Sequence, residues 1–320
     1  MKAKFEEIVN VAKIGTTEAG IDLPQVTLMA DREEKKPASL DVDRVEIMMI
    51  DNQFDFISPQ GALPVVGAVE DTERLCRFIY KYLDQIYRIR YTLDWHTCSH
   101  IFFSSAWVYG KDFTDENGEH KEGEHVLPSV TVITSEGIKE GKFRSALRSP
   151  AKALTYVKNV EAGGEELRIW PYHCQANSRG AALEGELEKM VKYHEVVREC
   201  NAMSYYKGQD QYSEQYGAIE AEYSPNNKVR LDILNVFEEP AVVRFYLAGQ
   251  AESHCFLRTL QQIVKHFANR PEILRKIVVL EDCMSCIGGF EQATAEKMEE
   301  IKKMGVKFVK STDVTDIYVA

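Results

Sequence analysis

The stretch AVVRFYLAGQAESHCFLRTLQQIVKHF, residues 241–267, decides the fold class because its periodicity changes within a few residues. Residues 241–249 form a short run rich in valine and aromatic side chains, which is typical of a strand covered on both faces. From residue 256 onward, apolar side chains recur every three or four positions, which predicts an amphipathic helix. A buried strand that leads into a helix favours a parallel sheet with helical crossovers.

The same alternation of strand and helix runs through most of the chain. Short apolar runs predict six strands, at residues 45–50, 86–93, 194–200, 241–249, 276–282 and 306–310. Helical periodicity predicts helices at residues 71–86, 179–191, 256–267 and 294–305. Because parallel strands need crossover connections, we expect an α/β fold, namely a three-layer α/β/α sandwich around a six-stranded, mostly parallel sheet.

Two regions lie outside this alternation. Residues 1–44 are charged around DREEKKPASLD and have no strand–helix pattern. We interpret them as an N-terminal extension that packs on the domain or on a neighbouring subunit. Residues 107–164 are rich in glycine, glutamate and lysine and have little periodicity, so we interpret them as an insertion in a main domain that spans residues 45–320.

The composition limits the classes of function. Asp and Glu total 50 against 39 Lys and Arg, a net charge of −11, which argues against a nucleic-acid partner because such binding depends on cationic side chains. No apolar run approaches the roughly 20 residues of a membrane span, so we expect no membrane partner. The seven cysteines are scattered, and the N-terminus lacks the apolar core of a secretion signal. We therefore expect a reduced, cytoplasmic protein.

Ligands of open α/β sheets bind at the carboxyl ends of the strands, where several polar residues of this chain lie. Asp51, in IDNQFDF, is a candidate general base, and the alternative is a turn or capping aspartate. Cys255 opens the helix after residue 249, where the helix dipole would lower a thiol pKa, and the alternative is an inert buried cysteine. Lys207 lies among tyrosines in SYYKGQDQYSEQYGA, and the alternative is a surface lysine.

A candidate metal site comes from three further residues. Asp94 and His96 follow the strand at residues 86–93, and an Asp-x-His pair on an extended backbone points both side chains the same way. His173, in WPYHC, would complete the three ligands of an open site for Zn²⁺, Fe²⁺ or Mn²⁺. His100 is a further candidate. The alternatives are a capping aspartate beside a partly exposed histidine and a histidine satisfied in a hydrophobic corner.

The CxxC motif in LEDCMSCIGG indicates a different class of protein. Cys283 and Cys286 could form a reversible disulfide in a non-catalytic binding or redox protein. No second CxxC accompanies the motif, and it follows a late strand rather than opening an early helix. Both features favour an enzyme over the redox alternative.

Five motifs in this order, IDNQFDF, LDWH, WPYHC, YYKGQDQYSEQYGA and GQAESHC, resemble those of the nicotinamidase/isochorismatase-like family of cysteine hydrolases. The resemblance covers roughly residue 45 to the C-terminus. It implies a catalytic triad of Asp51, Lys207 and Cys255, in which the thiol attacks an amide carbonyl. It also implies an oxyanion hole formed by the N–H groups of Ala251 and Cys255, and a cis peptide bond between Gln250 and Ala251.

The resemblance further implies one divalent metal ion, with zinc the first expectation and iron or manganese the alternatives. Its ligands would be Asp94, His96 and His173, with His100 as a possible fourth. The substrate pocket would include Gln53, Phe56, Trp170 and Tyr212. Gln53 would hydrogen-bond a metal-bound water, and the metal would hold a pyridine nitrogen.

The implied activity is that of a nicotinamidase, which hydrolyses nicotinamide to nicotinic acid and ammonia in NAD salvage. The alternative is a hydrolase of another small amide or carbamoyl compound. The resemblance also implies a homo-oligomer. Where the family usually has Thr-Asp before the His-Cys pair, this chain has Glu252 and Ser253, a difference that concerns the substrate more than the mechanism.

Overall fold

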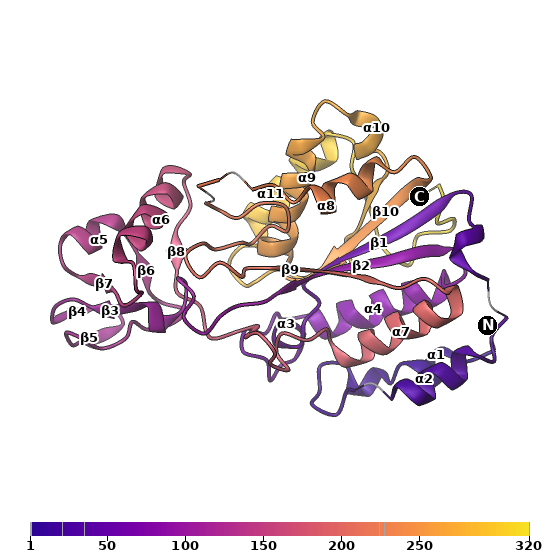
Figure 1. Cartoon of the computed structure of the whole chain (residues 1–320), viewed down its shortest axis with the longest axis horizontal. Coiled ribbons are helices and arrows are strands. Elements are labelled where there is room, and N and C mark those ends of the chain that lie inside the picture. Colours follow the sequence, from indigo (N-terminus) through magenta and orange to yellow (C-terminus); the bar gives the residue numbers. More distant parts are fainter. Residues whose placement is uncertain (1, 21, 35, 224, 227, 320) are drawn as a thin grey trace.

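The structure, a computed structural model, describes residues 2–20, 22–34, 36–223, 225–226 and 228–319 (Figure 1). Six strands form a central sheet in the order β12–β11–β10–β1–β2–β9, and all neighbouring pairs are parallel. They are β1 (Arg44–Ile50), β2 (Ile86–Asp94), β9 (Met203–Lys207), β10 (Val242–Gly249), β11 (Ile277–Leu280) and β12 (Lys307–Val309). The predicted fold class is confirmed, and the sheet is parallel throughout.

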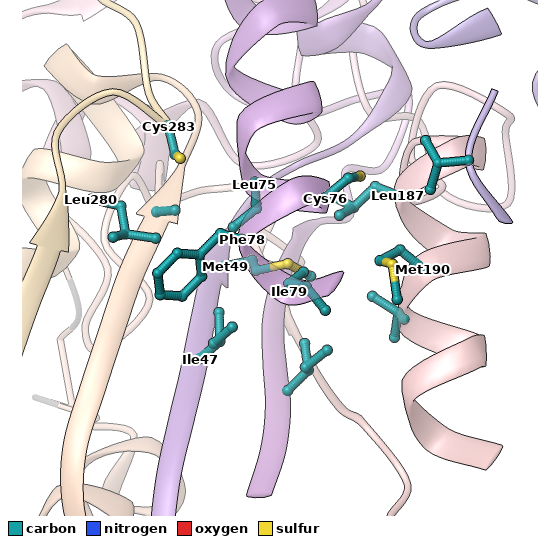
Figure 2. Close-up of a cluster of buried hydrophobic side chains, with 14 of the residues drawn as sticks. Ile47, Met49, Leu75, Cys76, Phe78, Ile79, Leu187, Met190, Leu280 and Cys283 are labelled. Carbon is teal, nitrogen blue, oxygen red and sulfur yellow. The ribbon is translucent and has the colours of Figure 1, made fainter. Parts of the chain in front are cut away.

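Helices cover both faces of the sheet. They are α4 (Ala68–Lys81) and α7 (Gly185–Arg198) on one face and α9 (Leu257–His266) and α11 (Glu291–Lys303) on the other. Alternate residues of β1 face opposite layers, as the two-residue period of a strand requires. Ile47 and Met49 pack against α4 and α7 (Figure 2), whereas Met48 and Ile50 pack in the cluster that contains α9 and α11. The three layers are those of the predicted sandwich.

One predicted strand is wrong. Residues 194–200 continue α7 as far as Arg198, and the sixth strand is β9 instead. Val197 lies one helical turn after Tyr193 and both are buried, so the valines that suggested a strand follow a helical pattern. Glu199 then ends the helix in the left-handed conformation, with φ 49°. β9 has little apolar signal because only alternate residues of this edge strand are buried.

Several predicted helix boundaries also shift, among them the start of α7 and the end of α4. α7 begins at Gly185 and not at residue 179 because Glu184 caps it. The Glu184 carboxylate accepts hydrogen bonds from the N–H groups of Glu186 and Leu187, both at 2.9 Å. α4 ends at Lys81, short of the predicted residue 86, where β2 already begins.

The residues between β2 and α7 form a small lobe beside the carboxyl ends of the strands, at the left of Figure 1. Its elements are β3 (Trp107–Tyr109), β4 (Phe113–Asp115), β5 (Gly118–His120), β6 (Val132–Ile133), α5 (Ser135–Lys139), β7 (Phe143–Ser145), α6 (Pro150–Ala162) and β8 (Leu167–Arg168). The strands pair antiparallel, as β3–β7, β4–β5 and β6–β8. A separate hydrophobic cluster that runs from Ile101 to Trp170 holds the lobe together.

The N-terminal segment packs on the layer that contains α4 and α7. Its helices α1 (Phe5–Ile8) and α2 (Leu23–Ala30) add Phe5, Ile8 and Val26 to the cluster beneath the sheet. The remaining short helices are α3 (Phe54–Ile57), α8 (Leu231–Leu234) and α10 (Pro271–Leu274). Across the part of the chain that the structure describes, no helix combines the length and the apolar character that crossing a membrane requires.

Candidate active site

The carboxyl ends of four strands, β10, β1, β2 and β9, meet at one edge of the sheet. Between β1 and β10 the chain changes the direction in which it adds strands to the sheet. From β1 the chain moves to β2 and β9 on one side, and from β10 to β11 and β12 on the other. Asp51 directly follows β1, Asp94 ends β2, Lys207 ends β9, and Cys255 lies shortly after β10. Such a reversal point leaves a crevice in which open α/β sheets bind their ligands.

Lys207 connects the acidic side chains of this crevice. Its Nζ lies 2.8 Å from Oδ2 of Asp51 and 2.5 Å from Oδ1 of Asp94. The same ammonium donates to the backbone oxygen of Gln215 at 3.0 Å and lies 3.5 Å from Sγ of Cys255. All of these side chains are buried. The structure therefore brings the three residues of the predicted triad into one contact network.

Burial sets the protonation of this network. It raises the pKa of Asp51 to about 6, with Lys207 offsetting part of the rise and the charge of Asp94 adding to it. Thr92 Oγ1 donates to Oδ1 of Asp51 at 2.6 Å. Burial opposes the charge on Lys207, but Asp51 and Asp94 outweigh it and hold the lysine pKa well above its usual value. A carboxylate with a near-neutral pKa is suited to accept and return a proton.

The thiol of Cys255 differs from the sequence expectation. Burial raises its pKa well above the ordinary value, and Lys207 offsets only part of the rise. Cys255 lies within a π-helical turn (Glu252–Phe256) that precedes α9, not at the first turn of an α-helix. The predicted lowering of the thiol pKa is therefore wrong for the resting protein. A neutral thiol needs a base such as Asp51 to become a nucleophile.

The turn before Cys255 is tightly constrained. Gly249 has φ 136°, and a Cβ there would lie 2.1 Å from the backbone oxygen of Ile50 on the neighbouring strand, so only glycine fits. The peptide bond between Gln250 and Ala251 is cis. The buried side chain of Gln250 donates to Oδ2 of Asp71 on α4 at 2.9 Å. These contacts fix the backbone that leads to the thiol.

A second cluster lies beside the first. Ligand atoms of Asp94, His96 and His173 all lie within 4.8 Å of one another. Nδ1 of His96 is 3.0 Å from the oxygen of Gly208, and Nδ1 of His173 is 2.8 Å from that of Pro171, so each ring donates through Nδ1 and leaves Nε2 for a ligand. Nε2 of His96 is buried without a hydrogen-bond partner among the described residues. These donors fit a divalent metal ion such as Zn²⁺.

The charges of this cluster suit a cation. Burial opposes ionisation of Asp94, but Lys207 and His96 outweigh it and hold the Asp94 pKa well below its usual range. Burial, reinforced by His96, lowers the pKa of His173 to about 3, so its ring is neutral. His100 lies next to the cluster, with its ring centroid 5.2 Å from that of His96. Among the described residues, however, its nitrogens do not belong to the set of ligand atoms that lie within 4.8 Å of one another.

A small cavity opens onto both clusters. Its empty volume is about 350 Å³, which includes space open to solvent. The lining residues are Phe56, Leu63, Asp94, Trp170, His173, Glu214, Tyr216, Ala251, His254, Cys255 and Ile287. Phe56 and Trp170 are thus the two expected pocket residues that line this cavity. A cavity of this size admits only a small, compact ligand.

Gln53 and Tyr212 lie elsewhere. The side-chain amide of Gln53 pairs with the backbone of Asp94, accepting from its N–H at 2.8 Å and donating to its oxygen at 2.7 Å, so it positions Asp94. The hydroxyl of Tyr212 accepts from the N–H of Ser149 at 2.9 Å, and its ring lines a separate cavity next to Lys152. Neither residue lines the cavity beside Cys255.

Three polar lining residues were missed from the sequence. Burial and the charge of Asp94 raise the pKa of Glu214 well above its usual value. The hydroxyl of Tyr216 accepts from Nε1 of Trp170 at 3.0 Å. His254 directly precedes Cys255. Glu214 and Tyr216 stand in the stretch YSEQY, but no periodicity there separates them from Tyr212.

The cysteines of the CxxC motif do not have the properties of a redox pair. All seven cysteines of the protein are free. Burial raises the pKa of Cys283 well above its usual value and that of Cys286 to about 12. Sγ of Cys286 donates to Oε2 of Glu252 at 3.1 Å. Thiols that stay protonated are poor nucleophiles, so these contacts favour a structural role.

No family model matches the chain, and no curated protein sequence matches it either. Solved structures do match, and they define the class of fold as the isochorismatase-like α/β fold of nicotinamidases and pyrazinamidases.

Among these structures, yeast nicotinamidase bound to the inhibitor nicotinaldehyde is 20% identical, with TM-score 0.53 over 83% of this chain and 99% of that one. A nicotinamidase/pyrazinamidase of Acinetobacter baumanii is 16% identical, with TM-score 0.51 over 85% and 98%. The L. infantum protein in complex with nicotinate is 19% identical, with TM-score 0.51 over 85% and 98%. At these identities the likeness establishes the fold.

Proposed function

We propose that the protein is a metal-dependent amide hydrolase with Cys255 as its nucleophile. The observation that carries this proposal is the position of Lys207 Nζ, 2.8 Å from Asp51 and 3.5 Å from the thiol, beside a small cavity. The order of motifs and the fold of the solved nicotinamidases support it.

The proposed reaction begins with the neutral thiol. As Sγ of Cys255 bonds to the amide carbon, Asp51 takes the thiol proton and then passes it to the leaving nitrogen, which departs as ammonia. The N–H groups of Ala251 and Cys255 stabilise the oxyanion. Lys207 keeps Asp51 oriented and balances its charge. Water then hydrolyses the thioester and releases the carboxylic acid.

Asp94, His96 and His173 would hold the metal ion, and His100 stays a further candidate. When bound, the ion supplies a Lewis-acid site at the cavity wall that can anchor a nitrogen of a heteroaromatic ring. Gln53 and the backbone oxygens of Gly208 and Pro171 orient these ligands. Zinc is the first expectation, and iron or manganese are the alternatives.

Nicotinamide is the proposed substrate because a single flat ring suits the cavity beside Phe56 and Trp170. The products would be nicotinic acid and ammonia, as in NAD salvage. The alternative is another small amide or carbamoyl compound, and a panel of such amides assayed for ammonia separates the two. A homo-oligomer and a cytoplasmic location remain part of the proposal.

The decisive experiment measures ammonia release from nicotinamide by the wild type and by Cys255→Ala. We expect the variant to lose at least about 10³-fold in kcat, because removing a covalent nucleophile leaves only the contribution of the surrounding site. Cys98→Ala is the matched control, since Cys98 is an exposed cysteine and should leave activity unchanged. Equal activity of the wild type and Cys255→Ala would overturn the proposal, and metal analysis of the same samples tests the ligand set.

A further inference from the structure

Two side chains lie between the cavity beside Cys255 and a groove on the surface. The groove encloses about 800 Å³ of space that includes open solvent, and its lining includes Leu257, Gln261 and Phe290. His254 and Tyr216 line both the groove and the cavity beside Cys255. They therefore lie between the smaller cavity and the larger groove.

His254 is held in this position by defined contacts. Its Nδ1 lies 2.8 Å from Oγ of Ser253, and that oxygen accepts from the N–H of Ile287 at 3.1 Å. Ser253 thus connects the imidazole to the backbone of Ile287 through its hydroxyl. The imidazole edge packs near Trp170, with ring centroids 5.6 Å apart, and near Phe290, at 4.7 Å.

The imidazole of His254 is an uncharged part of the cavity lining. Burial lowers the pKa of His254 to about 4, with Arg168 adding to the effect, so the ring is uncharged at neutral pH. Ser253, which also lines the groove, supplies the hydroxyl that holds the ring in place.

We propose that His254 is the residue that limits the size of the acyl group. This inference rests on the proposed amide hydrolysis and adds the substrate class. With the imidazole in place, the cavity takes single-ring carboxamides. Without it, the cavity and the groove become continuous, and a second ring fits. The cations of the groove are paired, Arg258 with Glu222 and Lys297 with Glu300, so the second ring is an uncharged one.

The first test compares nicotinamide with quinoline-3-carboxamide, which adds a fused, uncharged ring. We expect His254→Ala to raise kcat/KM for the larger amide relative to nicotinamide by about tenfold or more, the usual effect of removing a steric block from an apolar pocket. His254→Phe keeps a ring at the position and should keep the wild-type ratio. Gln261→Ala, which widens only the groove, should also leave the ratio unchanged.

The outcomes of this test distinguish a steric role of the His254 side chain from a role of its ring nitrogens. An unchanged ratio in His254→Ala overturns the proposal. An equal shift in His254→Ala and His254→Phe also overturns it, because the imidazole would then act through its nitrogens. His254→Ser serves as a second small variant if the alanine variant does not fold.

The second test does not depend on hydrolysis. Cys255 is labelled with iodoacetamide and with a bulky N-substituted maleimide, and mass spectrometry compares its labelling rate with that of the exposed Cys98. We expect His254→Ala to raise the relative rate of the bulky reagent by about tenfold, with little change for iodoacetamide. If the wild type hydrolyses no carboxamide, the proposed function fails. The ratio of the two labelling rates still shows whether the His254 side chain limits access to Cys255. An unchanged ratio contradicts this steric role.

Discussion

Asp94 belongs to two groups of side chains at once. Its Oδ1 lies 2.5 Å from Nζ of Lys207, and its Oδ2 lies 3.4 Å from Nε2 of His96. The side-chain amide of Gln53 pairs with its backbone and fixes its position. One carboxylate thus links the lysine beside the thiol with the proposed metal ligands. Any change that moves Asp94 therefore acts on both groups.

The pKa of Asp51 predicts how activity depends on pH. Since burial raises this pKa to about 6, Asp51 is protonated below that pH and cannot accept the thiol proton. We expect kcat/KM to fall about tenfold for each pH unit below 6, and the fall is measured from initial rates of ammonia release. An acidic limb centred near pH 4, the range of an unperturbed aspartate, would contradict the assignment.

Thr92 offers a control for this pH profile. Its hydroxyl donates to the ionised form of Asp51, which lowers the pKa of that carboxyl. Thr92→Val keeps the shape of the side chain and removes the donor, so the acidic limb should move upward by about one pH unit. A limb that stays in place would mean that another group controls it.

At the scale of elements, the sequence predicts those strands that are buried on both faces. β1, β10 and β11 are recognisable because apolar side chains face helices on either side, which gives continuous apolar runs. β9 was missed and residues 194–200 were misread because an edge strand and the end of an amphipathic helix have similar compositions. The strands of the lobe are two or three residues long, too short for any periodicity.

The same distinction applies to the candidate site. Asp51, Asp94 and Cys255 could be predicted because each follows a recognisable strand, and the strand determines where the side chain lies. Glu214 and His254 could not, because they come from irregular segments in which the direction of a side chain depends on tertiary contacts. The role of His254 in substrate selection remains a prediction.

Gly208 allows a test of how a loop supports the metal ligands. Its φ is +68°, and a Cβ there would lie 2.3 Å from Cε1 and 2.6 Å from Nδ1 of His96. Gly208→Ala should therefore displace the imidazole and break its hydrogen bond to the backbone oxygen of residue 208. We expect metal affinity to fall about 10- to 100-fold, as it does when other groups that orient a ligand are lost. Competition with a chelator measures the affinity.

Gly141→Ala is the matched control for this substitution. Gly141 has a similar φ of +74°, but nothing lies within 4 Å of the position of its Cβ. The cost of a left-handed alanine is thus the same at both sites, and only the contact with His96 differs. Equal metal affinities of the two variants would refute the role of Gly208.

In the whole molecule, the small lobe and the main sheet share the wall of the site. Phe102 and Phe103 belong to the buried cluster of the lobe, and their rings lie 4.8 and 6.0 Å from that of His96. Trp170, from the same cluster, lines the cavity beside Cys255. The packing of the lobe therefore determines the shape of the cavity, although the lobe supplies none of the three proposed catalytic side chains.

The N-terminal segment is joined to the rest of the molecule through Glu33. Its carboxylate accepts from the N–H groups of Lys2 and Ala3, at 2.8 and 2.7 Å, and from the hydroxyl of Tyr193 on α7 at 2.7 Å. Together with Phe5 and Ile8, these contacts place residues 2–8 against the helical layer. The segment behaves as part of the core in this structure.

Glu33→Gln should therefore weaken the whole fold and not only its N-terminus. The amide keeps the size of the side chain but loses the charge that strengthens three hydrogen bonds, so we expect the free energy of unfolding to fall by about 1–3 kcal/mol. Urea denaturation measures this, and hydrogen exchange at Lys2 and Ala3 should become faster. Glu34→Gln, at an exposed neighbouring position, should change neither quantity. If Glu33→Gln accelerates exchange without lowering the unfolding free energy, the segment is an attachment to the surface and not a part of the core.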